Sequence, residues 1–346
     1  MKTLTFGLVA ATMALLLTGC TGGDSNGSGT SSASSTANNG STNPSGSALK
    51  VAMVFDMGGR GDKSFNDSAY AGLQRAEKEF GFTGRTVDTK AAKDYETNLS
   101  TLAEDGNDVI FAIGINQQNA VQAIAPKYPN VHFAIVDAPV DAPNVRSLLF
   151  SEEQGSYLAG FIAGSTTKTG KIGFVGGQKI DLIEKFEAGY KAGALAANPK
   201  VVVLPGKYTE SWDDTQAGKE NAKALFSDGA DIVYHAAGRC GIGVIEAAKE
   251  TGKFAIGVDG DQDDQAPGHV LTSMIKHVDE AVYQTIKDVK DGKFTPGIKV
   301  YDLKVNGVGL SDMKYTKDII GADTLKKLDQ VKQDIIDGKI KVPTKL

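Results

Sequence analysis

The sequence predicts an α/β protein with two doubly wound parallel sheets, one in each of two lobes, joined by a hinge of several strands. Three observations support this prediction. From Leu49 onward, short apolar runs alternate with amphipathic stretches, which is typical of βα units. The alternation runs through one set of segments and then through a second set of the same kind. The runs are apolar throughout, which indicates strands covered on both faces, as in parallel sheets.

Residues 1–19 are predicted to form a secretory signal peptide. The apolar run from Phe6 to Leu17 is too short to span a bilayer as a mature helix and has the length of a signal core. It ends in LTGC, which resembles the bacterial lipobox. That resemblance implies cleavage before Cys20 and acylation of this cysteine. An ordinary signal peptide with a chance cysteine is the alternative, and export follows in both cases.

Residues 20–48 comprise Cys20 and a linker. From residue 21 to 48 the chain is almost wholly Gly, Ser, Thr, Asn and Ala, which cannot bury enough apolar surface to offset the entropy of ordering. We expect a flexible tether with a root-mean-square reach of roughly 30 Å. Cys240 is the only other cysteine, so no internal disulfide is expected within the folded part.

The first lobe is predicted to begin at Leu49. Helices are expected from about Phe65 and around Tyr95 and Val121. The strands that alternate with these helices are LKVAMVF (49–55), GRTVDT (84–89), DVIFAIG (108–114) and VHFAIVD (131–137).

The second lobe repeats this order after a helix near Tyr157. Helices are expected around Phe186, Ala222 and Glu246. The strands are KIGFVGG (171–177), KVVVLPG (200–206), DIVYHAAG (231–238) and KFAIGVD (253–259).

The remaining chain is too short for a third domain and is expected to complete the two sheets. It reads as a strand at 269–276, a helix at 278–292 and a strand at 298–305. We therefore expect the chain to cross between the lobes near Ser147, Lys276 and Lys299. Residues 49–146 and 276–298 then form the first lobe, and residues 147–275 and 299–346 the second. Several crossings make a hinge, and hinged lobes make a cleft that can close on a ligand.

Composition excludes several kinds of partner. With 346 residues and a formal net charge of -5, the chain has no general attraction to nucleic acid. Four scattered histidines make a zinc site unfavourable, and the acidic run DGDQDD lacks the glycine and the glutamate that a calcium loop needs. The GGRGDK loop only half matches a dinucleotide fingerprint. No cofactor and no metal are expected.

Ligands of doubly wound sheets bind beyond the carboxyl ends of the strands, and the polar and aromatic residues expected there suit a nucleoside. Phe65 and Trp212, one in each lobe, could stack on opposite faces of a planar ring. Asp56 and Asn66 could read the edge of that ring. The remaining candidates are a carboxylate and a lysine for two vicinal hydroxyl groups, Asp259 and Lys276, and a further carboxylate, Asp137.

Each of these residues also has a structural alternative. Phe65 could pack beneath its own helix, and Trp212 could belong to the core. Asn66 or Asp67 could cap the helix, which is compatible with binding. Asp137 could be a solvated carboxylate at the end of a strand.

Seven segments, in order, resemble motifs of the basic membrane protein family, the bacterial substrate-binding lipoproteins that include purine nucleoside receptors. The resemblance covers Leu49 to about Gly292. It is carried by FDMGGRGDKSFND, FAIVD, YTESWDDTQAGKENA, DIVYHAAG, GIGVIEAAKE, AIGVDGDQ and VLTSMIKHVDEAV.

This resemblance implies a type I periplasmic-binding-protein fold and a receptor that delivers nucleosides to an ATP-binding-cassette (ABC) importer. The implied partners are a nucleoside of the adenosine, guanosine or inosine type, a permease, and the membrane through the lipid anchor, on its periplasmic or outer side. A monomer is expected.

The resemblance also implies roles for single residues. Phe65 sandwiches the base, Asp56 and Asn66 contact its edge, and Asp259 and Lys276 contact the ribose. Two further positions complete the implied site: Gly238 allows close approach, and the second stacking group is Trp212, with Tyr234 or His235 as alternatives.

One departure from the family pattern is Arg239-Cys240, where small residues are more usual. An arginine near the ribose end could exclude bulk or attract a 5′ substituent.

Other functions stay open or are excluded. A membrane-anchored sensor with the same lobes is the main alternative to a transport protein. A nucleoside hydrolase would also use acidic groups near ribose, but no nucleophile-base pair is visible, so we expect no enzyme. A transcriptional repressor would need a DNA-binding headpiece where this chain has its signal peptide.

Overall fold

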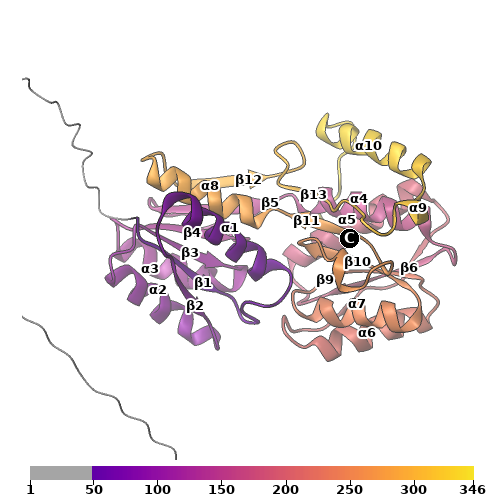
Figure 1. Cartoon of the computed structure of the whole chain (residues 1–346), viewed down its shortest axis with the longest axis horizontal. Coiled ribbons are helices and arrows are strands. Elements are labelled where there is room, and N and C mark those ends of the chain that lie inside the picture. Colours follow the sequence, from indigo (N-terminus) through magenta and orange to yellow (C-terminus); the bar gives the residue numbers. More distant parts are fainter. Residues whose placement is uncertain (1–48) are drawn as a thin grey trace, which may run out of the picture. The chain divides into compact units, whose positions relative to one another are not determined.

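Two sheets organise residues 49–346, the part of the chain that the computed structural model describes (Figure 1). The predicted signal peptide, Cys20 and the linker lie outside the described residues. In the first sheet the strand order is β12 (Gly297–Tyr301), β5 (Val145–Phe150), β4 (His132–Val136), β3 (Val109–Ile113), β1 (Val51–Phe55) and β2 (Arg85–Asp88). Every neighbouring pair in it is parallel.

The second sheet follows the same plan. Its order is β13 (Val308–Leu310), β11 (Val270–Lys276), β10 (Phe254–Asp259), β9 (Ile232–Ala236), β6 (Lys171–Gly176) and β7 (Val202–Val203), with β8 (Lys207–Tyr208) beside β6. Its pairs are parallel except that of β11 with β13. The prediction of two doubly wound parallel sheets is confirmed.

Helices cover both faces of the first sheet because successive strand residues point to opposite sides. In β1, Met53 and Phe55 pack against Leu73 of α1, whereas Val54 packs with Leu99 of α2. The helices of this first lobe are α1 (Phe65–Phe80) with α8 (Val278–Lys290) on one face, and α2 (Tyr95–Glu104) with α3 (Gln118–Ile124) on the other. Three short 3₁₀ turns join them, η1 (Ala92–Asp94), η2 (Ile115–Gln117) and η3 (Ala125–Lys127).

The second lobe is covered in the same way. Phe174 of β6 and Tyr234 of β9 pack with Phe186 of α5, while Val175 and Val233 face the opposite side. The helices are α4 (Glu152–Thr166) with α5 (Asp181–Ala197) on one face, and α6 (Thr215–Ser227) with α7 (Cys240–Thr251) on the other. A 3₁₀ turn, η4 (Asp263–Gln265), follows β10, and α9 (Lys317–Ile320) and α10 (Ala322–Ile336) lie over α4.

Glycines bring the backbones of α4 and α5 into direct contact. A Cβ atom on Gly160 would overlap the carbonyl oxygen of Tyr190, and one on Gly193 would overlap that of Tyr157. Any larger side chain at these positions must push the helices apart, and interiors packed at this density accommodate such a shift poorly.

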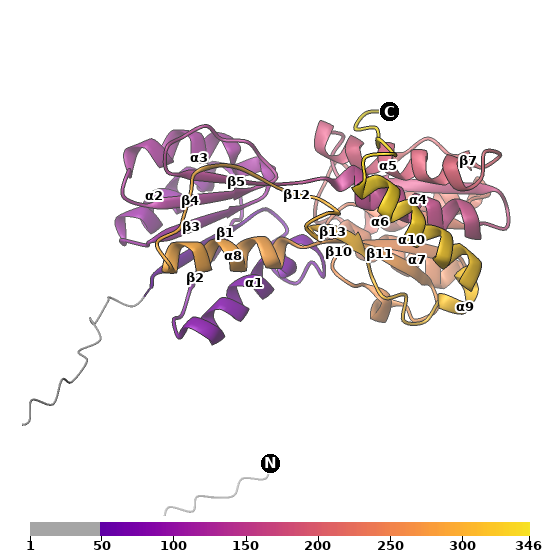
Figure 2. The ribbon, with the colours of Figure 1, turned by 90° about the horizontal axis from the view of Figure 1, so that it is seen from above.

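The chain passes between the lobes at three places, after β5, after β11 and after β12. The ends of the crossings are bonded to one another: the Ser151 amide donates to the Tyr301 carbonyl (3.0 Å), and the His277 amide to the Gly307 carbonyl (2.9 Å). Seen from above, the crossings run together between the two lobes (Figure 2). They form the hinge region.

Two crossings come slightly later in the chain than the expected positions near Ser147 and Lys299. β12 pairs with β5 from Gly297 through Tyr301, opposite residues 146–150. This ladder keeps both strands in the first sheet up to Phe150 and Tyr301. Among the described residues, no helix is both long enough and apolar enough to cross a membrane.

Candidate ligand-binding site

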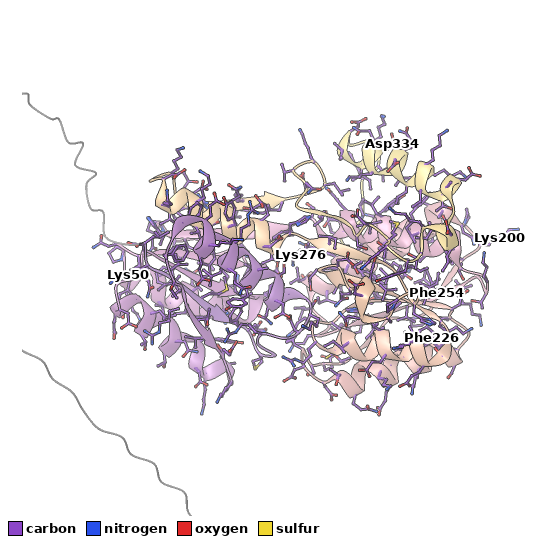
Figure 3. All side chains as sticks on the ribbon, viewed as in Figure 1. Lys50, Lys200, Phe226, Phe254, Lys276 and Asp334 are labelled. Carbon is purple, nitrogen blue, oxygen red and sulfur yellow. The ribbon has the colours of Figure 1, made fainter. Side chains whose placement is uncertain are left out.

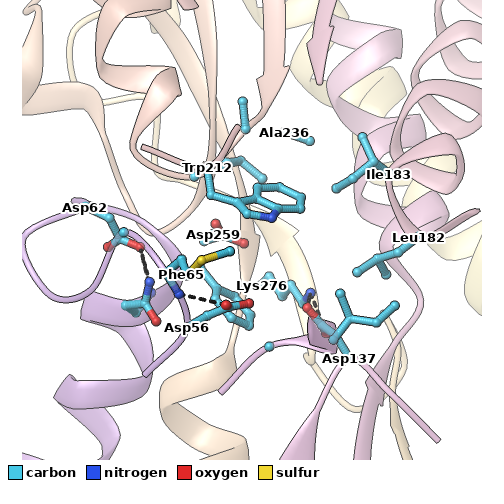
Figure 4. Close-up of a pocket in the computed structure, with 18 of the residues that line it drawn as sticks. Asp56, Asp62, Phe65, Asp137, Leu182, Ile183, Trp212, Ala236, Asp259 and Lys276 are labelled. Atoms are coloured by element: carbon cyan, nitrogen blue, oxygen red, sulfur yellow. Dashed lines mark hydrogen bonds and ion pairs between the residues drawn. The ribbon is translucent and has the colours of Figure 1, made fainter. Parts of the chain in front are cut away.

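The carboxyl ends of strands from both sheets meet at one cleft between the lobes, where doubly wound sheets bind their ligands. About 620 Å³ of this cleft, its open mouth included, is free of protein atoms. The structure brings all eight residues predicted as ligand contacts to the cavity in this cleft: Asp56, Phe65, Asn66, Asp137, Trp212, Gly238, Asp259 and Lys276 (Figure 4).

The start of α1 forms one wall of the cavity and is held by Asp62. The carboxylate of Asp62 accepts hydrogen bonds from the backbone amides of Ser64 (3.0 Å), Asn66 (2.8 Å) and Asp67 (3.1 Å). These bonds satisfy first-turn donors that have no partner within the helix. Asp62, which the sequence analysis missed, therefore caps the helix, whereas Asn66 and Asp67 had been considered for this role.

The cap also fixes the orientation of the Asn66 side chain. Asn66 Nδ2 donates to Asp62 Oδ2 (3.1 Å), so its amide oxygen is directed away from that carboxylate. This oxygen is buried and has no hydrogen-bond partner among residues 49–346. Asn66 lines the cavity and thus offers a ligand a hydrogen-bond acceptor that no other described residue uses.

Asp56 follows β1 and is held by three donors. Its carboxylate accepts from the amide of Met57 (2.7 Å), from Asn116 Nδ2 (3.0 Å) and from the hydroxyl of Tyr95. Burial raises the pKa of Asp56, and these hydrogen bonds partly oppose the rise. Gly114 is required beside it, because a Cβ atom there would overlap the carboxylate.

Lys276, at the end of β11, is the central cation of the site, where the two lobes meet (Figure 3). Its Nζ lies 2.7 Å from a carboxylate oxygen of Asp137 and 3.2 Å from Glu152 Oε1. Both the lysine and its partners are almost fully buried. Nζ also lies 5.0–5.6 Å from three ring centres, those of Phe65, Phe150 and Phe186, within cation–π range.

Burial and charge pull the pKa values of this cluster in opposite directions. Burial lowers the pKa of Lys276, but Asp137, Glu152 and Asp259 raise it more, so it lies above its ordinary value. Burial raises the pKa of Asp137 despite the attraction of Lys276. Burial likewise raises the pKa of Asp259 to about 7, with Lys276 and Ser64 opposing. Lys276 is therefore the charged centre to which these carboxylates are coupled.

Asp137 and Asp259 occupy corresponding positions in the two sheets. Asp137 directly follows β4 and Asp259 ends β10, and each has a positive φ, 71° and 65°. Such a backbone conformation is uncommon for residues other than glycine but is tolerated by aspartate. Asp137 is buried, not solvated as one alternative held. The ion-pair partners of Lys276 are Asp137 and Glu152, while Asp259 accepts a hydrogen bond from the hydroxyl of Ser64, across the cleft.

Trp212 lies on the side of the cavity opposite Asp56 and Phe65 (Figure 4). It comes from the loop between β8 and α6, and glycines make room for it. A Cβ atom on Gly177 would overlap the indole ring, and one on Gly238 would lie 3.2 Å from the Trp212 carbonyl oxygen. The indole Nε1 is buried and has no hydrogen-bond partner among the described residues.

Neither alternative to Trp212 reaches the cavity. Tyr234 is fully buried, with its ring centre 5.1 Å from that of Tyr190 and its hydroxyl 3.0 Å from that of Ser156. His235 is also fully buried and bonds Gln262 Oε1 (3.0 Å). Burial lowers the pKa of His235 to about 4.

Sequence reasoning missed the apolar wall of the cavity. The start of α5 contributes Leu182, Ile183 and Phe186, which line it beside Lys276. These residues share the helical spacing of core residues, so no local signal separates the two roles. Arg239 does not line the cavity. Among the described residues, no group of three or more His, Cys, Asp or Glu is placed to hold a metal ion.

Comparison with known proteins agrees with this architecture. The sequence profile of the family described as ABC transporter substrate-binding protein PnrA-like matches residues 49–345. A crystal structure of an ABC transporter solute-binding protein from Aeropyrum pernix is similar, with a TM-score of 0.80 and 31% identity over 86% of this chain and 93% of that chain. The fold is thus that of type I periplasmic binding proteins, as expected.

Two curated relatives are similar over most of their length. A CD4+ T-cell-stimulating antigen of Listeria monocytogenes is 41% identical over 85% of this chain and 88% of its own. An ABC transporter nucleoside-binding protein, BmpA, of Lactococcus lactis is 40% identical over 86% of this chain and 90% of its own. The resemblance to the basic membrane proteins is confirmed. A family of substrate-binding proteins is consistent with the expectation that the chain is not an enzyme. The chain belongs to the PnrA-like family of ABC transporter substrate-binding proteins.

Proposed function

We propose that this protein captures nucleosides, with a preference for purines, between its lobes and delivers them to the permease of an ABC importer. The observation that carries the proposal is a cavity between Phe65 and Trp212 in which two polar atoms, Asn66 Oδ1 and Trp212 Nε1, have no partner among the described residues. The nucleoside-binding relative from Lactococcus supports the same ligand class.

The base is proposed to lie between the two aromatic rings. Offset stacking on an aromatic side chain contributes about 0.5–1.5 kcal/mol beyond the burial of apolar area. Asn66 Oδ1 and the carboxylate of Asp56 can then accept hydrogen bonds from ring or exocyclic N–H groups, and Trp212 Nε1 can donate one. Unsatisfied buried groups are costly, so a ligand that satisfies them binds preferentially.

The ribose is proposed to lie toward Lys276. Asp259 and Asp137 can accept hydrogen bonds from its hydroxyl groups, and Gly238, which has no side chain, lets the backbone approach the ligand closely. A phosphate does not suit this end of the cavity. Four aspartates line the cavity, Asp56, Asp62, Asp137 and Asp259, against one ammonium group that already binds two carboxylates. We therefore expect nucleosides rather than nucleotides.

The proposed mechanism is hinge closure. The first lobe binds the base through Asp56, Phe65 and Asn66, and the second lobe brings Trp212 and Asp259 over it. Closing excludes water, which strengthens each hydrogen bond in the cavity. The closed form then presents both lobes to the permease. An acylated Cys20, followed by the flexible linker, is proposed to hold the protein on the outer side of the membrane.

Calorimetric titration of the full-length protein in detergent, unfolded and refolded to remove carried ligand, tests this function. The ligands are adenosine, guanosine, inosine, cytidine, uridine, ribose and adenosine monophosphate. We expect tight binding of the purine nucleosides, weaker binding of cytidine and uridine, and none of ribose or the monophosphate. Binding of ribose alone, or of no nucleoside, would refute the proposal.

A further inference from the structure

A glycine-rich loop of the first lobe, residues 57–64 (MGGRGDKS), lies between β1 and α1 and borders the cleft. Gly58 and Gly61 have φ values of 97° and 85°, which other residues rarely adopt. The first lobe holds the loop at both ends. The Gly59 amide donates to the Asp56 carbonyl (3.1 Å), and the Gly61 and Lys63 amides donate to the carboxylate of Asp67 (2.6 and 3.0 Å).

The second lobe binds the carbonyl oxygens that this loop presents. Arg239 Nη2 donates to the carbonyls of Gly58 (2.7 Å) and Arg60 (2.9 Å). Gln262 Nε2 donates to the carbonyl of Lys63 (2.9 Å). These bonds join residues far apart in sequence that belong to different lobes, so they exist only while the lobes lie together.

Arg239 stands at an unfavourable place for a cation. It immediately precedes α7, and a positive charge at a helix N-terminus is repelled by the helix dipole. The two carbonyl oxygens carry partial negative charge and offset that repulsion. Both hydrogens of Nη2 are used by these carbonyls, so this nitrogen has none left for a 5′ substituent, one of the roles considered for Arg239.

The contact between Arg239 and the loop lies directly beside Trp212. The backbone amide of Arg239 donates to the carbonyl of Trp212 (3.0 Å). A Cβ atom on Gly58 would lie 3.6 Å from that same carbonyl oxygen. The loop and Arg239 therefore both lie against the backbone carbonyl of Trp212, whose residue lines the cavity.

We propose that Arg239 is a positioning residue that fastens the loop of residues 57–64 to the second lobe and thereby sets how long a ligand stays bound. This inference rests on the proposed function. The Arg239 bonds form after the ligand has entered and the lobes have closed, so they stabilise the closed form relative to the open one. Their loss speeds opening and release and leaves the rate of entry unchanged.

The chain supplies its own probe for this test, because Trp212 is its only tryptophan and lines the cavity. Stopped-flow tryptophan fluorescence of the full-length protein with inosine and with adenosine measures the association and dissociation rates. The variants are Arg239→Ala, Arg239→Lys and the control Arg75→Ala. Arg75 lies on α1 and pairs with Glu280 of α8 in the same lobe (2.6 Å), so its removal deletes a similar charge without touching the contact between the lobes.

In Arg239→Ala we expect the dissociation rate to rise about 10-fold or more, as befits two lost hydrogen bonds to a charged group. The association rate should change less than about 2-fold. The terminal nitrogen of lysine stands one bond closer to the backbone, so the dissociation rate of Arg239→Lys should lie between those of wild type and Arg239→Ala. The dissociation rate of Arg75→Ala should match that of wild type. An unchanged dissociation rate in Arg239→Ala, or an equal effect in Arg75→Ala, overturns the proposal.

Failure of the proposed nucleoside binding can be distinguished from failure of the positioning role of Arg239. If the wild type binds neither inosine nor adenosine, the nucleoside proposal fails, and hydrogen exchange of the peptide covering residues 57–64 in the protein as purified decides on Arg239. Faster exchange in Arg239→Ala than in Arg75→Ala supports the positioning role. Equal exchange in the two variants refutes it.

Discussion

Lys276 Nζ lies 2.7 Å from the carboxylate of Asp137, and this buried ion pair joins the end of β11 in the second sheet to the end of β4 in the first. Because its two members come from different lobes, the pair couples the charge of the cavity to the arrangement of the lobes. Breaking one half of such a pair leaves an uncompensated buried charge, which is far more costly than losing an exposed pair.

Lys276→Met should therefore lower the free energy of unfolding by about 3–5 kcal/mol. The matched control is Lys185→Met. Lys185 also approaches Glu152 (3.7 Å) but is more than one third exposed, so its loss should cost about 1 kcal/mol or less. Urea denaturation followed by circular dichroism measures both. Equal losses in the two variants would show that the Lys276 pair contributes no more than an exposed one.

The stability of the ligand-free protein should depend on pH through Asp259. Burial raises its pKa from 3.8 to about 7 in the folded state. The contribution of this group to stability is therefore complete below about pH 4 and is lost as the pH rises toward 7, at most about 1.4 kcal/mol per pH unit.

Asp259→Asn carries no such titration. We expect the free energy of unfolding of the wild type to fall between pH 4 and 7 relative to that of the variant, measured by urea denaturation at each pH. Parallel curves for the two proteins would contradict an elevated pKa at Asp259.

The two aromatic walls should each contribute to nucleoside affinity. Phe65→Ala and Trp212→Ala are expected to weaken binding by about 2 kcal/mol or more, as for buried aromatic anchors. Phe294→Ala is the control, since this ring stacks on His132 in the first lobe, away from the cavity. Calorimetry of proteins with unchanged circular dichroism measures the effect. Unchanged affinity in both cavity variants would refute stacking of the base between Phe65 and Trp212.

Trp212→Phe separates stacking from hydrogen bonding. The phenyl ring keeps an aromatic face but lacks the indole N–H, which has no partner among the described residues. We expect an affinity between those of wild type and Trp212→Ala in the same titration. Affinity equal to wild type would mean that Nε1 meets no acceptor on the ligand.

Asp259 should distinguish ligands by their sugar hydroxyl groups. Asp259→Asn is expected to weaken the binding of adenosine by about 10-fold or more, as for a lost charged acceptor, and that of 2′,3′-dideoxyadenosine far less. Comparative calorimetry of the two ligands tests this. An equal loss for both would remove Asp259 from the ribose site.

The sequence pattern was sufficient for the fold because strand and helix periods are local properties. It also placed Asp56, Asp137 and Asp259 at strand ends, and strand ends of parallel sheets meet at one edge. Asp62 escaped notice because its function is to bond the amides of the next turn, and the charged loop around it shows no distinct signal. The pairing of Lys276 with Glu152 was equally hidden, since it depends on how α4 packs beneath β11.

The contacts of Arg239 could not be predicted from the sequence either. As a departure from a family pattern it was recognisable, but its partners are two backbone carbonyls, which every residue possesses. Only the approach of two lobes selects those of Gly58 and Arg60. Contacts to backbone atoms across a hinge therefore lie beyond what a linear pattern can specify.

The first lobe is completed by segments that are synthesised late. Leu73 and Ala76 on α1 pack in the same core as Val278 and Val282 on α8, and β5 finds its outer neighbour only in β12. A ribosome delivers those covering segments after the whole second sheet but for β13. The first sheet and its covering helices therefore cannot be completed until most of the second lobe has been synthesised.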